Sequence, residues 1–292
     1  MSSRPVGRSV GAVVLSMGTR PEELPRAMES LLAQTGVDLD VVVVGNGWEP
    51  TGLPPEVRTV HLPENVGIPQ GRNVGAAAVS GDVIFFYDDD AFLPTDDVVS
   101  QLVDVLQADP RVGAVQPRPV DPDGRPSPGR WVPRPGGRDP LRPGVVAWVW
   151  EGTFAVRRDA FEGAGGWPGH FFYGHEGIEL IWRVWDQGFV GWYAPEIVVN
   201  HPATSPTRHA VYWRMNARNR VWVARRNLPW PLVLPYLLTW VLVTLARVRS
   251  GPAMRAWVAG FGEGLGSGAG ERRPMSWRTV WRLTRAGRPP VL

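Results

Sequence analysis

The segment VIFFYDDD at residues 83–90 joins an apolar run to three consecutive carboxylates. The apolar part, residues 83–87, has the β-branched and aromatic composition of a buried strand. In an open α/β sheet, ligands bind beyond the carboxyl ends of the strands, where Asp88, Asp89 and Asp90 would lie. Carboxylate oxygens suit Mg²⁺ and Mn²⁺, which commonly also hold a phosphate. The segment therefore indicates a metal–diphosphate site, with a solvated acidic turn as the alternative.

Strand-like and helix-like patterns alternate on both sides of this segment. Such alternation is typical of a doubly wound, mostly parallel sheet flanked by helices. Besides 83–87, we predict strands at residues 10–16, 40–44, 57–62, 113–117, 145–150 and 197–199. We predict helices at residues 22–34, 71–78, 96–107, 177–187, 210–226, 252–265 and 277–284.

Residues 121–143 interrupt this pattern because they are dense in Pro, Gly and Arg. Proline is excluded from helix interiors and central strands, so we predict a long mobile loop near the site. Its arginines either clamp a phosphate or are merely solvated, and we favour solvation; they are Arg125, Arg130, Arg134, Arg138 and Arg142.

A series of short motifs surrounds the acidic segment in a fixed order. Upstream, NVGIPQGRNVGA occupies residues 65–76; downstream stand GTFAVRRDAF at 152–161, GGW at 165–167, FFYGHEGIELIWR at 171–183 and YAP at 193–195, followed by His201. The series covers roughly residues 9–228 and resembles the family 2 glycosyltransferases of the GT-A fold. The stretch 174–185 is also similar to a short segment of the polypeptide N-acetylgalactosaminyltransferases.

The resemblance implies an inverting, metal-dependent transfer of a sugar from a nucleotide-sugar donor to an acceptor hydroxyl. Asp88 and Asp90 match the D-x-D pair that holds Mn²⁺ or Mg²⁺ in this family. His201 matches a third metal or diphosphate contact, with a structural histidine as the alternative. Arg72 and Asn73 match the family's Arg-Asn and are expected near the base or the diphosphate.

Further donor contacts are expected where the first two strands end. Ser16, Gly18 and Arg20 follow the first strand, and a glycine there allows close approach of the backbone to a nucleotide. At the end of the second strand the family usually has an Asp, in a D-N-x-S pattern, that touches the base; Gly45 stands in its place in this chain, and Asn46, the next residue, is expected to contact the donor. Asp89, between the two predicted metal ligands, is expected to contact the donor.

The acceptor side departs from the family, whose Glu-Asp pair reads Glu176-Gly177 in this chain. The Asp that often serves as general base is therefore missing. Glu176 is the best candidate base, at a predicted helix start that favours a carboxylate. Glu179, three residues on, is the reserve, and either acid has a simple helix-capping role as its alternative.

Composition limits the chemistry and the partners. The 292 residues, 43% of them hydrophobic, suffice for one large α/β domain with a helical extension. There is no cysteine, which excludes disulfides and cysteine-ligated zinc, and no lysine, which excludes Schiff-base catalysis. From Arg208 onward the only acids are Glu263 and Glu271, so this basic part suits anionic partners. No nucleic-acid-binding motif is present, and we expect no nucleic-acid partner.

We divide the chain into a GT-A domain at residues 1–208 and a basic, apolar helical extension at 209–292. Within the domain, a nucleotide-binding half spans about 9–118 and an acceptor half about 144–208. The polar first nine residues lack an apolar signal region, so we expect a cytoplasmic protein.

The uncharged run at residues 229–246 has three interpretations: a membrane-spanning helix, a buried core element, or an interfacial segment. The run is slightly short for spanning and contains two interior prolines. Trp230, Tyr236 and Trp240 are residue types found at membrane interfaces. We favour a peripheral segment on the inner face of the plasma membrane, with Arg on lipid phosphates; the flanking arginines are Arg225, Arg226, Arg247 and Arg249.

Two other functions compete with sugar transfer. A nucleotidyltransferase also pairs carboxylates with a metal on an α/β sheet, but it usually needs a lysine-bearing, glycine-rich loop after the first strand. A non-catalytic sugar-nucleotide-binding module would explain why Gly45 and Gly177 replace acids. For the leading function, the acceptor is a lipid-linked or cell-envelope glycan, or a small-molecule secondary metabolite.

Overall fold

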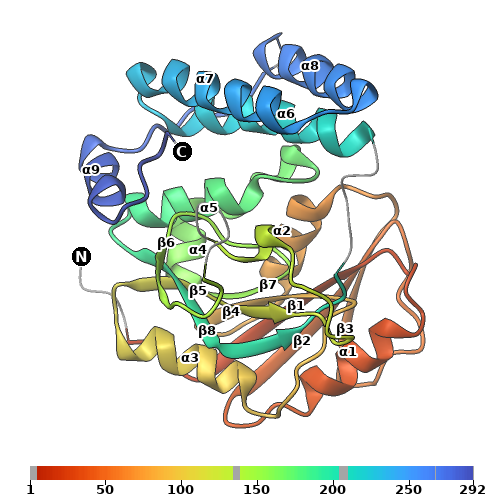
Figure 1. Cartoon of the computed structure of the whole chain (residues 1–292). Coiled ribbons are helices and arrows are strands. Elements are labelled where there is room, and N and C mark those ends of the chain that lie inside the picture. The colour runs from red at the N-terminus through yellow and green to blue at the C-terminus, as the bar shows by residue number, and fades with distance from the viewer. Residues whose placement is uncertain (1–4, 134–138, 204–209, 267, 292) are drawn as a thin grey trace.

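An eight-stranded mixed sheet forms the centre of the protein (Figure 1). The computed structural model describes residues 5–133, 139–203, 210–266 and 268–291. The strands lie in the order β3-β2-β1-β4-β7-β5-β8-β6. Their bounds are Ser9–Ser16 (β1), Asp38–Asn46 (β2), Arg58–Leu62 (β3), Val83–Asp88 (β4), Val112–Val120 (β5), Gly144–Val146 (β6), Thr153–Arg157 (β7) and Val190–Asn200 (β8).

The sheet is parallel in its first half and mixed in its second. Strands β3, β2, β1 and β4 are parallel to one another, as are β5 and β8. Strand β7 runs antiparallel between β4 and β5, and β6 is antiparallel to β8. The predicted fold class, a mostly parallel sheet flanked by helices with a helical C-terminal extension, is confirmed.

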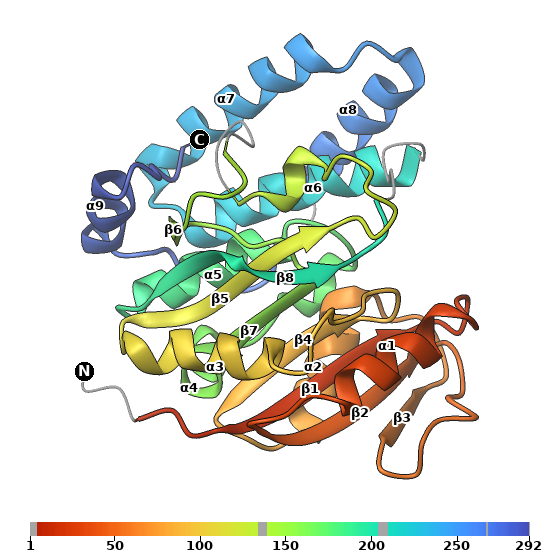
Figure 2. The same ribbon diagram turned by 60° about the horizontal axis from the view of Figure 1, so that its bottom comes forward.

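Helices cover both faces of this sheet (Figures 1 and 2). They are Glu23–Leu32 (α1), Ile68–Ala78 (α2), Val98–Ala108 (α3), Arg158–Ala164 (α4), Glu176–Asp186 (α5), Ala210–Asn227 (α6), Trp230–Arg247 (α7), Gly251–Gly266 (α8) and Trp277–Arg285 (α9). The protein has two hydrophobic cores, one on each face of the sheet, because successive side chains along a strand point to opposite faces. On β1, Ala12 and Val14 pack toward α1 and α3, whereas Val13 packs toward the other face, which carries α5.

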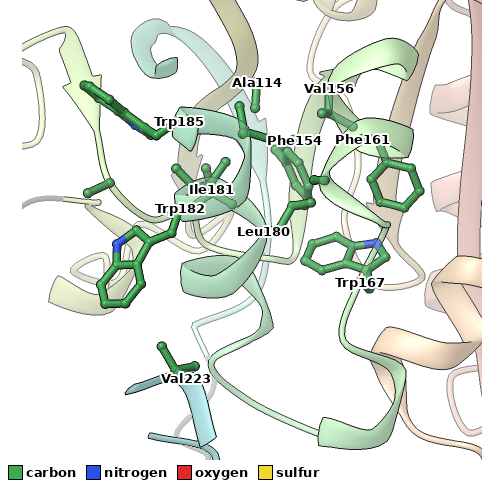
Figure 3. Packing of buried hydrophobic residues seen from close by; sticks show 14 of the residues in the cluster. Ala114, Phe154, Val156, Phe161, Trp167, Leu180, Ile181, Trp182, Trp185 and Val223 are labelled. Carbon is green, nitrogen blue, oxygen red and sulfur yellow. The ribbon is translucent and has the colours of Figure 1, made fainter. Parts of the chain in front are cut away.

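Helix α5 is the central helix of that second core (Figure 3). Leu180 and Ile181 are fully buried, and Trp182 and Trp185 are nearly so. Phe154 and Trp167 meet edge-on, with ring centroids 5.5 Å apart. Aromatic pairs in this geometry add to the burial energy, so the start of α5 is held on a rigid base.

Several elements differ from the sequence prediction. Strand β7 and helix α4, residues 153–164, were not predicted as elements, because this stretch is short and was recognised only as a motif. The predicted strand at 145–150 ends at Val146, and the following residues form a cavity wall. Strand β5 is longer than the predicted 113–117 and continues through Pro119. Its pairing with β8 shifts register between Pro117 and Arg118. Such an irregularity accommodates prolines, which have no N–H to donate to a neighbouring strand.

The predicted loop at 121–143 contains a single 3₁₀ turn, Gly129–Trp131, among its described residues. Trp131 is buried, and its carbonyl accepts a hydrogen bond from Gln116 Nε2 at 2.8 Å. This contact brings the turn back over the sheet, beside the carboxyl ends of its strands. Arg134 and Arg138 lie outside the described residues.

The C-terminal extension packs on the domain through α6, which lies against both α5 and α8. Helices α6 and α8 approach closely because α8 has glycines at the contact: a Cβ at Gly260 would lie 2.0 Å from the Arg214 carbonyl oxygen. Tyr236 of α7 packs edge-on against Trp182 of α5, with ring centroids 5.9 Å apart. The core of the α5 face therefore continues into the extension.

Candidate active site

A cavity of about 1390 Å³ opens at the carboxyl ends of β1, β2 and β4. Its walls continue along the 3₁₀ turn at 129–131, the segments 147–152 and 172–178, and the helices α6 and α7. A volume of this size exceeds that of a typical small-ligand pocket.

Three potential metal ligands meet at the strand-end side of the cavity. One ligand atom each from Asp88, Asp90 and His201 lies within 4.8 Å of the other two. His201 Nε2 is 3.1 Å from Asp90 Oδ1 and 3.4 Å from Asp88 Oδ2. His201 Nδ1 donates to the Pro202 carbonyl at 2.9 Å, which directs Nε2 toward the carboxylates. Two carboxylates and an imidazole nitrogen fit a divalent cation.

Arg72 lies beside this triad, on α2. It is buried, and its Nη2 is 2.7 Å from Asp88 Oδ1. Its Nη1 is also buried and has no hydrogen-bond partner in the described chain. Burial raises the pKa of Asp88, but the hydrogen bond from His201 and then the charge of Arg72 bring it below its ordinary value. Asp88 is therefore an anion, ready to bind a cation.

Arg20 covers the other side of the triad. Its guanidinium forms an ion pair with Asp90 and lies 3.6 Å from Asp89 Oδ1. Burial raises the pKa of Asp89, against a hydrogen bond with Ser16 that lowers it. The guanidinium of Arg20 thus places a positive charge beside the carboxylates of Asp89 and Asp90. Asp89 lies outside the group of potential metal ligands.

Two tryptophans that the sequence did not suggest enclose the imidazole of His201. Its ring centroid is 4.8 Å from that of Trp150 and 5.3 Å from that of Trp131, both in edge-to-face geometry. Both tryptophans line the cavity. They come from irregular segments, so only their closeness in the fold reveals this role.

Asn46 closes the donor end of the cavity. Its Oδ1 accepts from the Val66 N–H at 2.8 Å, and its Nδ2 donates to Asn65 Oδ1 at 2.9 Å. Both side chains line the cavity. The amide at the end of β2 therefore holds the loop that enters α2.

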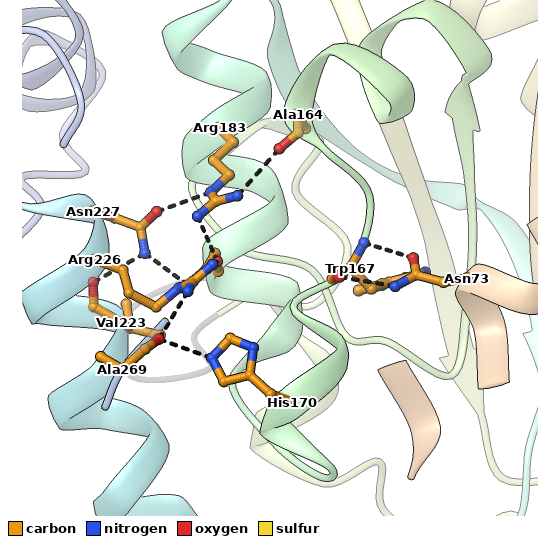
Figure 4. Close-up of polar contacts among 10 residues, drawn as sticks. Asn73, Ala164, Trp167, His170, Arg183, Val223, Arg226, Asn227 and Ala269 are labelled. Atoms are coloured by element: carbon orange, nitrogen blue, oxygen red, sulfur yellow. Dashed lines mark hydrogen bonds and ion pairs between the residues drawn. The ribbon is translucent and has the colours of Figure 1, made fainter. Parts of the chain in front are cut away.

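The structure places two predicted donor residues outside the cavity lining. Asn73 donates to the Trp167 carbonyl and accepts from the Trp167 N–H, each at 2.9 Å (Figure 4). Gly18 makes a turn at φ +69°, and a Cβ there would lie 2.5 Å from the Trp48 ring. Asn73 thus ties α2 to the segment before α5, and Gly18 permits a tight turn.

Glu176 is the first residue of α5 and lines the cavity. It is buried, and its Oε2 has no hydrogen-bond partner in the described part of the chain. Burial, followed by the nearby charge of Glu151, raises its pKa to about 8. A carboxyl with a pKa in this range is suited to exchange a proton near neutral pH.

Glu151 is a second carboxyl in this part of the cavity, and the sequence did not suggest it. Its Oε1 accepts from the Gly177 N–H at 3.0 Å, and burial raises its pKa. A Cβ at Gly177 would lie 2.7 Å from this Oε1 and 2.5 Å from the Val149 carbonyl oxygen. Gly177 therefore replaces the family's Asp where the Glu151 carboxylate, from a different segment, fills the space. The only signal in the sequence was an acid directly before the GTFAV motif.

The structure argues against Glu179, the reserve candidate, as a base. Glu179 is fully buried away from the cavity lining. Its Oε1 is 2.9 Å from Nη2 of both Arg183 and Arg226, and its Oε2 accepts from Asn227 Nδ2 at 2.8 Å. Figure 4 shows Arg183 of α5 close to Arg226 and Asn227 of α6. This buried network joins α5 to α6, and it occupies both carboxylate oxygens.

Both the sequence and the structure of this chain are similar to known glycosyltransferases. Residues 13–164 match the model of the family described as glycosyl transferase family 2. An uncharacterized glycosyltransferase from Haemophilus influenzae is 26% identical over 110 residues, which make up 36% of this chain and 37% of that protein. The similarity thus spans little more than a third of the curated relative.

Three solved structures share the fold. GalNAc-T7 with UDP, GalNAc and Mn²⁺ has a TM-score of 0.62 at 14% identity, over 96% of this chain and 58% of that one. The mannosyltransferase PcManGT from Pyrobaculum calidifontis, with GDP-Man and Mn²⁺, has a TM-score of 0.55 at 18% identity, over 99% and 87%. TarS from S. aureus has a TM-score of 0.59 at 12% identity, over 88% and 48%. At these identities the likeness concerns the fold. Because the family model covers more than half of the chain, and the ordered motifs lie on a GT-A fold, this protein belongs to glycosyl transferase family 2.

Proposed function

We propose that the protein transfers a sugar from a nucleotide-sugar donor to an acceptor hydroxyl, in a metal-dependent reaction that inverts the anomeric carbon. One observation carries the proposal: the Asp88–Asp90–His201 group and the acceptor-side carboxyl of Glu176 line the same cavity. The structural neighbours GalNAc-T7 and PcManGT contain UDP with GalNAc, and GDP-Man, respectively, each with Mn²⁺. These neighbours support a nucleotide-sugar donor for this chain.

The donor side has residues for the two charged parts of the donor. Asp88, Asp90 and His201 would hold Mn²⁺ or Mg²⁺, which when bound supplies positive charge for the leaving diphosphate. Arg20 pairs with Asp90, so it is already close enough to turn toward a diphosphate. Arg72 fixes the carboxylate of Asp88 through its 2.7 Å ion pair.

Glu176 is the proposed general base. It takes the proton of the acceptor hydroxyl while the oxygen attacks the anomeric carbon and the nucleoside diphosphate leaves from the opposite face. One displacement of this kind inverts the configuration. Glu151 lies close enough to raise the pKa of Glu176, so the two carboxyls form a pair whose proton is released near pH 8.

We further propose that α7 rests on an anionic membrane surface on the cytoplasmic side. Trp230–Arg247 is, among the described helices, the one long and apolar enough to cross a membrane, with a mean hydropathy of 1.4 and 17% of its residues buried. Its outer side exposes apolar side chains at every third or fourth position, one stripe of the helix: Trp230, Leu234, Leu238, Leu242 and Leu245.

The exposed stripe disfavours the core-packing interpretation of this segment and favours the interfacial one. The expected lipid contacts of the flanking arginines need two corrections. Arg226 is buried in the Glu179 network, so it does not reach a lipid phosphate. Arg225 donates to the carbonyl oxygens of Gly264 and Leu265. Arg247 and Arg249, both exposed at the end of α7, remain for that role.

Donor binding and turnover test the proposed function together. Thermal unfolding of the whole chain with UDP- and GDP-sugars, with and without Mn²⁺, identifies the donor, because a ligand of the native state raises the melting temperature. Release of nucleoside diphosphate is then measured. Sugar transfer predicts a metal-dependent stabilisation and diphosphate release; release of pyrophosphate would indicate a nucleotidyltransferase, and binding without turnover a non-catalytic module.

A further inference from the structure

A buried guanidinium without a carboxylate partner lies on the acceptor side of the cavity. Arg220 of α6 lines the cavity and is 8% exposed. Its Nη1 donates to the Tyr236 hydroxyl at 3.2 Å, and its Cζ lies 3.5 Å above the Trp240 ring. Among the residues that the structure describes, no acid lies within ion-pair distance of Arg220.

Arg226, six residues later on α6, shows what a compensated buried arginine looks like in this protein. It is 6% exposed, and its guanidinium donates bidentate hydrogen bonds from Nε and Nη2 to the Glu179 carboxylate. Arg220 is buried to almost the same extent, yet its contacts are a neutral hydroxyl and an aromatic face. Burying a charge costs several kcal/mol unless a countercharge compensates it. Burial accordingly lowers the pKa of Arg220.

His175 provides a second, independent sign of a ligand at the same wall. It lines the cavity, is 9% exposed, and its Nε2 has no hydrogen-bond partner in the described chain. Its backbone is held at φ +69°, a conformation uncommon for residues other than glycine, although histidine adopts it more often than most. Burial and then the charge of Arg220 hold its pKa well below the ordinary value, so the ring is neutral. Its Nε2 and the guanidinium of Arg220 therefore belong to one polar region.

Apolar surface continues from this region along the cavity. Ile178 and Trp182 of α5 line it, and so do Tyr236, Trp240 and Val243 of α7. The inner side of α7 thus walls the cavity, while its outer side exposes the apolar stripe. A ligand that satisfies both features has an anionic group for Arg220 and an apolar part for the α7 wall.

We propose that Arg220 binds an anionic phosphate group of the acceptor, and that the acceptor continues from this phosphate along the apolar wall of α7. The inference rests on the proposed sugar transfer, because the wall adjoins Glu176. Guanidinium groups bind phosphate through paired N–H donors, and this pairing would compensate the buried charge. The phosphate belongs either to an amphiphile or to a small soluble acceptor.

The test measures thermal unfolding in EDTA, so that the metal site contributes nothing. The probes are inorganic phosphate and octyl phosphate, with octyl glucoside as the uncharged amphiphile, all below micelle-forming concentrations. We expect octyl phosphate to raise the melting temperature of the wild type and not that of Arg220→Met; Arg220→Lys, which keeps the charge, retains part of the shift. Arg255→Gln, at an exposed arginine of α8, is the matched control and retains the full shift.

The stability of the ligand-free variant is a second readout. Since Arg220→Met removes an uncompensated buried charge, its melting temperature without ligand should equal or exceed that of the wild type. A shift with octyl phosphate alone assigns a lipid-like acceptor, and a shift with inorganic phosphate as well assigns a small phosphate-bearing one. The proposal is overturned if Arg220→Met unfolds at a lower temperature and keeps the phosphate shift, or if neither phosphate stabilises the wild type. Nucleotide sugar with Mn²⁺ tests donor binding separately, and Arg220→Met should leave that shift unchanged.

Discussion

Burial and the neighbouring charge of Glu151 both raise the pKa of Glu176. The activity of the protein should therefore depend on pH. As a base Glu176 works only when ionised, so we expect turnover to rise with pH through about 8. Glu151→Gln removes the neighbouring charge and should move this rise to lower pH. The measurement is the pH profile of kcat, with saturating donor and Mn²⁺; a profile that Glu151→Gln leaves in place would contradict the pairing.

Glu176→Gln keeps the shape of the side chain and removes its basicity. A loss of about 10²-fold or more in kcat is expected for a general base, with donor-induced stabilisation unchanged. A small loss in Glu176→Gln together with a large one in Glu151→Gln would assign the base to Glu151.

The same carboxyl affects stability in a defined pH window. The native state keeps the proton of Glu176 up to about pH 8, whereas the unfolded chain releases it near the ordinary value of 4.5. The native state therefore binds more protons between these values, and the contribution of Glu176 to the free energy of unfolding, fully present below pH 4.5, is lost as the pH rises to 8. Urea unfolding at several pH values should show a flatter dependence in Glu176→Gln than in the wild type.

Asp90 is the most buried carboxylate of the potential metal ligands. Asp90→Asn removes one charge from that group and the partner of Arg20. We expect it to abolish both the Mn²⁺-dependent stabilisation by nucleotide sugar and the turnover. Asp123→Asn, at an exposed acid of the 121–143 loop, is the control. Full activity of the wild type in EDTA would refute the metal requirement.

At the scale of the elements, the start of α5 separates two acids that the sequence placed together. Glu176 and Glu179 are three residues apart, a spacing that puts side chains near one face of a helix. The cavity and α6 both meet this turn, so Glu176 lines the cavity whereas Glu179 lies in the ion-pair network. A sequence gives the spacing of residues along a helix, but it does not say which neighbours pack around that helix.

The network around Glu179 yields a prediction for the joint between α5 and α6. Glu179→Gln leaves Arg183 and Arg226 buried without their countercharge. Removing one partner of such a pair costs about 3–5 kcal/mol. Urea unfolding should show this loss, with a lower denaturation midpoint, whereas kcat per folded molecule should change little. A large loss of kcat in a fully folded variant would restore Glu179 as a catalytic candidate.

The parts of the fold that depend on local pattern were predictable. Buried strands such as 83–87 and amphipathic helices such as 96–107 leave a periodic signal, and Asp88, Asp90 and His201 follow strands whose ends meet. The unpredicted parts depend on contacts between irregular segments. Trp131, Trp150 and Glu151 reach the site from such segments, and no periodicity marks them.

At the scale of the whole molecule, the exposed stripe of α7 predicts binding to anionic lipid. We expect the protein to float with anionic liposomes at low salt and to be released partly as salt screens Arg247 and Arg249. Leu238→Glu with Leu242→Glu places charge in the middle of the stripe and should abolish flotation. Leu141→Glu, at an exposed leucine outside the extension, should float normally. Wild-type protein that stays at the bottom of the gradient would contradict the membrane proposal.

Helix α7 has two sides with different surroundings, the cavity on one and an exposed apolar stripe on the other. If the stripe rests in lipid, the cavity wall formed by α7 lies beside the plane in which an amphiphilic acceptor diffuses. Encounter would then occur in two dimensions. Turnover would follow the number of acceptors per unit area of membrane, so adding inert lipid at constant acceptor would slow the reaction although the amounts of acceptor and protein are unchanged.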